Sequence, residues 1–308
     1  MNVFVAGGSG AIGVPLVRAL VASGHKVTAL TRSESKRDQL RALGADVAVA
    51  DALDRDQLIA AVEAARSTHV IHELTALPKD APRRARDIEP TNRLRIEGTR
   101  NLIDAAINAG TRRFLVGSFA PLSPRESPAV ASGFSRTEDD APAAAVRSME
   151  TQVLEATKAG AIQGVVLRYG MFYGLGTPST DAMIEMVRKR MFPVVRADAG
   201  LLPVIHIDDA VSATVLALDA APAGAVYEIV DDRPVSLTEI VEALAEYTGS
   251  AAPFHVPAWV PRLLAPYMAR VMSVRLPLSN AKAKAELGWR PRYSTMRDGL
   301  AQMFRRAA

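Results

Sequence analysis

Three glycines near the N-terminus have the spacing of a phosphate-binding turn. The segment Gly-Gly-Ser-Gly-Ala-Ile-Gly at positions 7–13 follows the apolar run Val3–Ala6 and opens an amphipathic stretch. In such a turn Gly7 permits the tight bend, Gly10 lets the backbone approach a pyrophosphate, and Gly13 allows close packing of helix on strand. A simple turn with one positive φ would need one glycine rather than three. The spacing therefore predicts dinucleotide binding.

The residues after this turn and after the second strand indicate which dinucleotide is bound. Ala11 and Ile12 lead into a helix, whose first N–H groups and positive dipole end favour phosphate. The second apolar run ends at Leu30, and Arg32 follows where a site for NAD would hold the ribose 2′-hydroxyl with an acidic residue. A guanidinium suits a 2′-phosphate instead. NADP is therefore the expected cofactor, with NAD favoured less. The alternative for Arg32 is an ordinary solvated basic turn.

Histidines and carboxylates elsewhere form no recognisable catalytic or metal-binding pattern. His69 and His72 are three positions apart in an expected strand, so their side chains face opposite sides and cannot share a metal ion. Near His206, Asp208 or Asp209 stands at an expected helix start, where a carboxylate caps more often than it catalyses. The sequence has no Gly-x-Ser-x-Gly elbow and no paired-carboxylate motif. No metal site is expected.

Short apolar runs alternate with amphipathic segments through the first half of the chain. Strands are expected at Val3–Ala6, Val27–Leu30, Val47–Ala50, Val70–His72, Phe114–Val116 and Val165–Leu167. Helices are expected between them, at Pro15–Ala22, Leu58–Ala65 and Leu94–Ala109. Continuous apolar strands separated by helices are typical of a parallel sheet covered on both faces. The pattern therefore predicts a Rossmann-like, doubly wound α/β fold.

The alternation loosens after residue 168, which predicts two domains. Residues 1–168 are expected to form the dinucleotide-binding domain. Residues 169–308 are expected to form mainly a substrate-binding cap, with 204–232 returning to the first domain. Within the first domain, Phe119–Arg147 is rich in Pro, Ser and Ala and has few periodic apolar positions. It is expected to be a long loop, and loops of that length are usually functional or mobile.

Composition excludes several classes of protein. Hydrophobic residues make up 49% and charged residues 23% of the chain, which is ordinary globular usage. Cysteine is absent, which excludes disulfides, iron–sulfur clusters and thiol catalysis. The net charge of +4 is spread along the chain, whereas a nucleic-acid binder would cluster it. With no signal-peptide pattern and no apolar run of about 18 residues, we expect a cytoplasmic protein without membrane or nucleic-acid partners.

Several short motifs follow one another along the chain in a specific order and spacing. They are the glycine turn, Asp51-Ala52-Leu53-Asp54, Val70-Ile71-His72, Glu97-Gly98-Thr99-Arg100-Asn101-Leu102, Leu167-Arg168-Tyr169-Gly170 with Tyr173-Gly174, His206-Ile207-Asp208-Asp209-Ala210 and Leu287-Gly288-Trp289-Arg290-Pro291. Through them the chain resembles the short-chain dehydrogenase/reductase superfamily, in its extended, NAD-dependent epimerase/dehydratase-like branch. The resemblance covers nearly the whole length. It implies that Asp51 and Ala52 meet the adenine, that His72 and Glu73 lie beneath the cofactor ribose, and that Leu167–Tyr173 passes near the nicotinamide.

The chain departs from the catalytic pattern of that superfamily. Family members use a Tyr-x-x-x-Lys pair, in which the lysine lowers the pKa of the tyrosine, and the corresponding positions hold Pro142 and Val146. Neither side chain can exchange a proton. The proton source is then expected to be Tyr169, whose segment borders the nicotinamide, Ser118, which ends the fifth strand, or a bound water.

Other polar positions of the family also differ. The serine or threonine that binds the substrate oxygen falls at Phe119, and the asparagine of nucleotide-sugar enzymes falls at Met171. The asparagine before the Glu-Gly-Thr run is replaced by Arg95, although Asn92 lies one helical turn earlier. The motifs of the family that bind the cofactor are therefore present, while its catalytic Tyr-x-x-x-Lys pair is absent.

Three functions stay open at this point. The first is an NADP(H)-dependent oxidoreductase that reduces a small carbonyl or enone substrate, with the cofactor supplying the hydride. The second is a nucleotide-sugar epimerase or dehydratase, and the third is a non-catalytic NADP(H)-binding sensor or regulator. Apolar helical surfaces near Leu94–Ala109 and Met149–Ala156 either pair with a second subunit, as in the family's dimers, or pack on the chain's own sheet.

Overall fold

The computed structural model describes most of the chain. The described residues are 1–78, 82, 84–123, 140–195, 200–257, 259–267, 269 and 275–307. The loop expected at Phe119–Arg147 therefore lies partly outside them.

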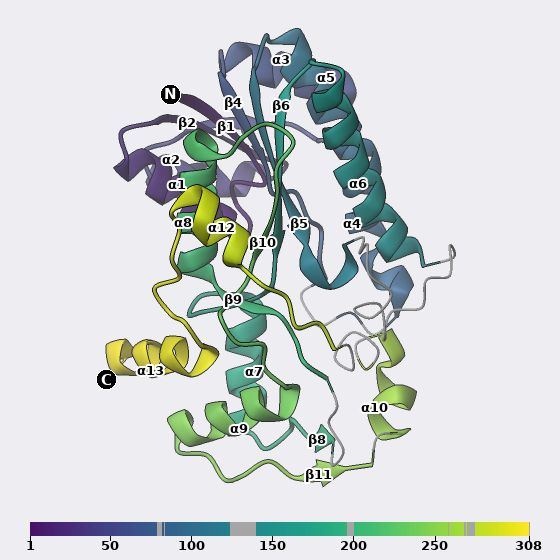
Figure 1. Cartoon of the computed structure of the whole chain (residues 1–308), viewed down its shortest axis with the longest axis vertical. Coiled ribbons are helices and arrows are strands. Elements are labelled where there is room, and N and C mark those ends of the chain that lie inside the picture. The colour runs from purple at the N-terminus through teal and green to yellow at the C-terminus, as the bar shows by residue number, and fades with distance from the viewer. Residues whose placement is uncertain are drawn as a thin grey trace.

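Seven parallel strands form the main sheet, in the spatial order β10-β6-β5-β4-β1-β2-β3 (Figure 1). The strands are β1 (Asn2–Ala6), β2 (Lys26–Thr31), β3 (Asp46–Val49), β4 (His69–His72), β5 (Arg113–Phe119), β6 (Gln163–Tyr169) and β10 (Val226–Ile229). The chain runs outward from β1 to β3 and then returns to the other side of β1 through β4. The carboxyl ends of β1 and β4 therefore flank the topological switch point, where ligands bind in such sheets.

Helices cover both faces of this sheet (Figure 1). One face carries α1 (Gly13–Ala22), α8 (Ile207–Ala220) and α12 (Ala281–Leu287), and the other carries α3 (Arg55–Ala64), α5 (Thr99–Asn108) and α6 (Ala141–Lys158). The short α2 (Arg37–Arg41) packs beside β3. Because successive strand residues point to opposite faces, Val3 and Val5 enter the first apolar cluster, while Phe4 and Ala6 enter the second.

The helical segment before β5 contains a π-helical turn. The helix α4 (Glu89–Arg93), the π turn at Leu94–Gly98 and α5 follow one another without a break. Both α4 and the π turn pack against α6. The side chain of Gln152 in α6 donates to the carbonyl oxygen of Ile96 over 3.2 Å. Such turns inside α-helices are frequent at functional sites.

The remaining elements form a smaller lobe, below the main sheet in the view of Figure 1. They are α7 (Pro178–Arg188), α9 (Leu237–Thr248), α10 (Trp259–Leu264), α13 (Met296–Ala307) and two short parallel pairs, β7 (Met171–Tyr173) with β9 (Val204–His206) and β8 (Val194–Val195) with β11 (His255–Val256). A third apolar cluster holds this lobe together, with Val241 and Leu244 of α9 packed near Met296 and Leu300 of α13.

The Rossmann-like α/β fold is confirmed, and every expected strand is present. The loop expected over Phe119–Arg147 is wrong in its last part, because α6 begins at Ala141. Pro142 fits the first turn of a helix, where an N–H would have no intrahelical partner, and the alanines after it favour helix. After the excursion into the smaller lobe, β10 returns to the edge of the main sheet.

Candidate active site

The glycine turn forms a cradle that most side chains cannot enter. Gly7 has a φ of 92°, and a Cβ at this position would lie 2.5 Å from the carbonyl oxygen of Glu73. A Cβ at Gly13 would lie 2.1 Å from the carbonyl oxygen of Gly7. At Gly10, which is exposed, the nearest atom to a Cβ would be 3.2 Å away. The fold itself therefore requires Gly7 and Gly13, whereas Gly10 leaves backbone open to a ligand.

Helix α1 begins at this turn without a side-chain cap. Its N-cap residue is Ile12, whose side chain caps nothing, and the preceding Ala11 is exposed. The first N–H groups of a helix have no partner inside the helix, and an anion satisfies them well. The arrangement fits the pyrophosphate of a dinucleotide.

The end of β2 lies beside the glycine turn. The hydroxyl of the buried Thr31 contacts the hydroxyl of Ser9 over 3.2 Å and ties the strand to the turn. The next residue, Arg32, has an exposed side chain, and no ion pair to it occurs in the described part of the chain. Nearby Arg37, in contrast, pairs with Glu34. The guanidinium of Arg32 is thus available to a 2′-phosphate.

The residues expected at the adenine lie in a well-ordered turn after β3. The carboxylate of the exposed Asp51 accepts a hydrogen bond from the Leu53 N–H over 2.9 Å. The carbonyl oxygen of the buried Ala52 accepts one from Nδ2 of Asn101 over 3.0 Å. This contact explains the asparagine of the Glu-Gly-Thr-Arg-Asn motif, because it fixes the turn from the facing helix α5.

His72 is a neutral, fully engaged histidine at the end of β4. Its Nδ1 accepts a hydrogen bond from the Leu74 N–H over 3.2 Å, so the ring proton lies on Nε2, which contacts the hydroxyl of Thr99 over 2.9 Å. Burial, and secondarily the positive charge of Arg95, lowers the pKa of His72 to about 4. His72 therefore does not titrate near neutral pH.

Tyr169, the first expected proton source, lies in the core beside Glu73. Its hydroxyl is 2.9 Å from Oε1 of Glu73 and 2.7 Å from the hydroxyl of Thr214 in α8. Burial raises the pKa of Glu73 to about 8 and, together with that carboxyl group, raises the pKa of Tyr169 well above its usual value. Gly117 makes room for this pair, because a Cβ there would lie 2.2 Å from Oε2 of Glu73.

Ser118, the second expected proton source, belongs to a buried ionic network. Its hydroxyl donates to Oε1 of Glu150 over 2.5 Å, and the same oxygen is 2.8 Å from the hydroxyl of Ser123. The guanidinium of Arg168 pairs with Glu150 over 2.6 Å and with Glu228 over 3.3 Å. A serine that donates its one proton to a carboxylate has none left for a substrate.

The two positions that the resemblance assigns to the family's proton-transfer pair lie in the first turns of α6. Pro142 and Val146 are both buried, and Val146 packs with Leu122 and Ala143 in a small apolar cluster. Where a phenol and an ammonium group would stand in the family, the chain therefore has hydrocarbon.

Two buried side chains on the helical segment that begins with α4 have polar atoms without a hydrogen-bond partner among the described residues. Arg95, in the π turn, is 8% exposed, and its Nη1 has no such partner. Asn92, in α4, is 3% exposed, and within the same residues neither of its side-chain polar atoms has one. In the sequence, Arg95 stands where the family has an asparagine and Asn92 lies one helical turn earlier, and no local pattern marks either side chain as unsatisfied.

The expected capping role of Asp208 or Asp209 is wrong. The N-cap of α8 is His206, whose Nδ1 accepts from the Asp208 N–H over 3.2 Å. The carboxylate of Asp209 instead accepts from the backbone N–H groups of Arg292 and Tyr293, over 2.7 and 3.0 Å. Asp209 therefore anchors the C-terminal segment around Arg292 and Tyr293 to the start of α8.

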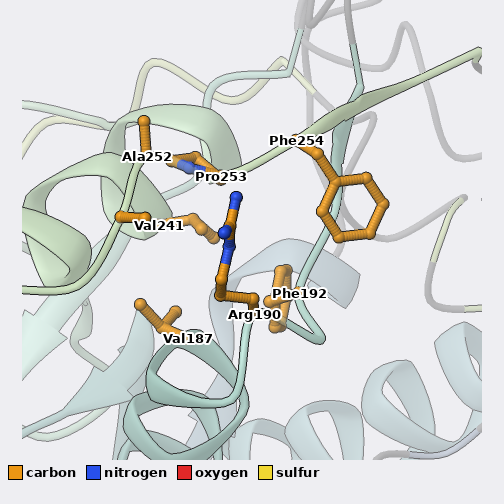
Figure 2. A pocket seen from close by; sticks show the side chains of 8 residues that line it. Val187, Arg190, Phe192, Val241, Ala252, Pro253 and Phe254 are labelled. Atoms are coloured by element: carbon orange, nitrogen blue, oxygen red, sulfur yellow. The ribbon is translucent and has the colours of Figure 1, made fainter.

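A small pocket in the smaller lobe is not a candidate for chemistry. It lies where α7 ends near α9, and in Figure 2 the side chain of Arg190 extends among Val187, Val241 and Pro253. Its lining consists of Val187, Arg190, Phe192, Val241, Ala251, Ala252, Pro253 and Phe254. The lining contains no acid, histidine or nucleophile.

The described residues contain no group of three or more His, Asp or Glu side chains arranged to hold a metal ion. They also contain no helix with the length and apolar character needed to cross a bilayer.

The chain is similar to known proteins of the NAD-dependent epimerase/dehydratase family and to reductases. The model of the NAD dependent epimerase/dehydratase family matches residues 3–230. A 3-diazoavenalumate denitrifying reductase from a Streptomyces species is 38% identical, over 98% of this chain and 100% of the relative. A 4-hydroxy-2-methyl-3-oxo-4-farnesyl-3,4-dihydroquinoline-1-oxide ketoreductase from Stigmatella aurantiaca is 29% identical, over 97% and 95%. The UDP-glucose 4-epimerase of Thermotoga maritima has the same fold, with a TM-score of 0.79 at 20% identity over 99% of this chain and 98% of that one.

Proposed function

Because the chain belongs to the NAD-dependent epimerase/dehydratase family, we propose that it is an NADP(H)-dependent reductase of a small organic substrate. One contrast carries the proposal: the glycine cradle is intact, while hydrocarbon fills the positions of the proton-transfer pair at Pro142 and Val146. The names of the two relatives above, both reductases, support the same reaction class.

The chain's own residues would bind the cofactor from the glycine turn outward. The N-terminus of α1 receives the pyrophosphate, Arg32 pairs with the 2′-phosphate, and Asp51 and Ala52 border the adenine. His72 and Glu73 lie beneath the ribose. When bound in its reduced form, the cofactor supplies a hydride.

Epimerisation and dehydration of a sugar both begin by removing a proton, and they are disfavoured here. A phenol must be held at a lowered pKa to act as that base, and an adjacent ammonium group is what lowers it. The positions that would supply both groups hold Pro142 and Val146. Reduction needs a hydride and a proton donor instead, and a donor does not require a lowered pKa.

For a carbonyl or enone substrate, the proton donor is Tyr169, Ser118 or a water molecule, with Tyr169 preferred. The phenol is linked to Glu73, which holds its own proton at neutral pH, so the pair contains a proton that can be passed on. Ser118 is the weaker candidate because its hydroxyl belongs to the ionic network of Glu150 and Arg168.

A diazo substrate is the second candidate, favoured by the lack of a dedicated proton donor. When hydride replaces the N₂ group of a cationic diazonium form, one bond to hydrogen forms, neutral N₂ leaves, and no proton is consumed. Such a reaction needs no Tyr–Lys pair. The 38% identical relative carries a diazo substrate in its name.

Cofactor oxidation tests the proposal directly. NADPH absorbance is followed with the full-length protein against a panel of aldehydes, ketones, enones and diazo carboxylates. Turnover of any of them supports a reductase, and the substrate class separates the two candidates. Tight NADPH binding without turnover would instead support a sensor or regulator, and rapid conversion of nucleotide sugars would overturn the proposal.

A further inference from the structure

We propose that Arg95 and Asn92 form a subsite that binds the carboxylate of the substrate. The proposal rests on the proposed function in one respect, since it assigns a substrate class to the same reductase. It concerns two side chains that the cofactor does not need.

The two side chains are buried without partners, which is unusual for groups of this polarity. Arg95 has an unpartnered Nη1 at 8% exposure, and Asn92 has unpartnered amide atoms at 3% exposure, among the residues that the structure describes. Buried polar groups are nearly always hydrogen-bonded, because removing such a group from water without giving it a new partner is unfavourable in free energy. A ligand group that accepts from both would remove that cost.

Two other covered arginines of the described chain satisfy this rule. The buried Arg113 donates from Nε and Nη2 to the carbonyl oxygens of Ala217, Leu218 and Ala221 over 2.5 to 3.0 Å. Arg168, which is partly buried, pairs with the carboxylate of Glu150. Arg95 forms no ion pair with a carboxylate in the described ranges, and it carries its charge in an apolar setting: burial lowers its pKa to about 10, so it stays protonated at neutral pH.

Arg95 and Asn92 belong to the same helical segment. They are three positions apart, a spacing that places side chains on the same face of an α-helix. Arg93 between them points outward, where it pairs with Glu97 at 53% side-chain exposure. The π turn that carries Arg95 packs against α6, the helix that holds Pro142 and Val146.

This side of the segment borders the cofactor site. The positive charge of Arg95 acts on His72, the last residue of β4, which is paired with Ala6 just before the glycine turn. The other titratable group that acts on Arg95 is Tyr267, from the segment after α10. The subsite therefore lies between the cofactor cradle and α6, where a reducible group would be held.

The chemistry of the pair selects a carboxylate. A guanidinium donates two parallel hydrogen bonds to the two oxygens of a carboxylate, and an amide N–H supplies a third donor. One positive charge balances a single negative charge, whereas a phosphate dianion would leave a second charge buried and uncompensated. The name of the 38% identical relative specifies the anion of a carboxylic acid, 3-diazoavenalumate.

Thermal unfolding tests whether Arg95 is a binding group or a structural one. A buried cation without a protein partner costs folding free energy, so Arg95→Met is expected to raise the Tm of the free protein. Arg93→Met, which removes an exposed cation two residues away, should change the Tm little. A clear fall in Tm for Arg95→Met, with Arg93→Met unchanged, would show that Arg95 supports the fold and would overturn the proposal.

Calorimetric binding tests the ligand class. The probes are octanoate and cinnamate, each compared with its methyl ester, on protein saturated with NADP⁺. Wild type is expected to bind at least one acid more tightly than its ester, and Arg95→Met to weaken that acid by about tenfold to a hundredfold while leaving the ester unchanged. Asn92→Ala should weaken the acid less, because it removes a neutral donor. Equal affinity of wild type for each acid and its ester would overturn the proposal, as would full acid binding by Arg95→Met.

The affinity of each variant for NADP⁺ separates this proposal from the proposed function. Arg95→Met and Asn92→Ala are expected to bind NADP⁺ as wild type does. If wild type bound no nicotinamide cofactor, the reductase assignment would fail, and the comparison of acid with ester would then be made on the free protein.

Discussion

The Tyr169 hydroxyl donates a hydrogen bond of 2.9 Å to Oε1 of Glu73 in the core of the protein. The Tyr169 hydroxyl also contacts the Thr214 hydroxyl over 2.7 Å, and Thr214 donates to the carbonyl oxygen of Ala210 over 2.8 Å. None of these contacts brings a positive charge to the Glu73 carboxyl group, so the cost of burying its charged form dominates. Burial therefore raises the pKa of Glu73 to about 8, and the carboxyl group holds its proton at neutral pH.

The protonated Glu73 predicts how stability depends on pH. In the unfolded chain the carboxyl group loses its proton near pH 4.5, whereas in the folded protein it keeps it to about pH 8. The folded state therefore binds more protons in this window, and the free energy of unfolding contributed by Glu73 falls as pH rises from about 4.5 to about 8. Glu73→Gln keeps a side-chain oxygen that can accept from Tyr169 and removes the titration. We expect it to be more stable than wild type at pH 8, by on the order of a few kcal/mol, and similar at pH 4.5.

Chemical denaturation at a series of pH values measures this effect. Asp231 is a second buried acid with a pKa raised to about 8, so Glu73→Gln should reduce the pH dependence of wild type without abolishing it. Glu63→Gln, at an exposed position of α3, is the matched control and should follow wild type. Parallel curves for Glu73→Gln and wild type would mean that Glu73 is ionised in the folded protein.

Arg32 predicts the choice of cofactor. Its exposed guanidinium follows β2, and one charge-assisted contact to a 2′-phosphate should favour NADPH over NADH by roughly tenfold in affinity. Arg32→Asp places a carboxylate there, which repels the phosphate and accepts from a 2′-hydroxyl, so the preference should be lost or inverted. Fluorescence titration with both cofactors measures it. If wild type bound NADPH and NADH with equal affinity, Arg32 would have no role in cofactor choice.

The same added side chain is expected to have different consequences at Gly10 and at Gly13. A Cβ at Gly10 would come no closer than 3.2 Å to the backbone, so Gly10→Val should fold but obstruct the pyrophosphate and weaken NADPH binding. A Cβ at Gly13 would lie 2.1 Å from the Gly7 carbonyl oxygen, so Gly13→Val should lose stability as well. Thermal unfolding and NADPH titration of both variants check this. A folded Gly10→Val with full affinity would place the phosphates elsewhere.

Local sequence patterns predicted the sheet and the glycine turn before α1, because these depend on neighbouring residues. Apolar runs mark strands wherever they occur, and the glycine turn is a contiguous motif. The contact of Glu73 with Tyr169 spans 96 positions and exists because Gly117, on a third strand, leaves space for the carboxyl group. No local pattern encodes that.

The missing partners of Arg95 and Asn92 were beyond sequence reasoning for the same reason. Their burial depends on the π turn, which shifts the register of the helix, and on the packing of α6 against it. The start of α6 itself was missed because Pro142 reads as a loop residue unless the helix that begins there is already known. The role of Asp209 required knowing that the C-terminal segment returns to α8.

Tyr169→Phe distinguishes the two candidate substrate classes. The variant removes the hydroxyl that links Glu73 to Thr214, so reduction of a carbonyl, which consumes a proton, should fall by about tenfold or more. Affinity for NADPH should not change, because the phenol lies in the core rather than in the glycine cradle. Hydride transfer to a diazonium group consumes no proton and should be unaffected. Steady-state kinetics with one substrate of each class, alongside the half-buried control Tyr247→Phe in α9, measures the difference. Undiminished carbonyl reduction by Tyr169→Phe would remove this tyrosine from proton transfer and leave water as the donor.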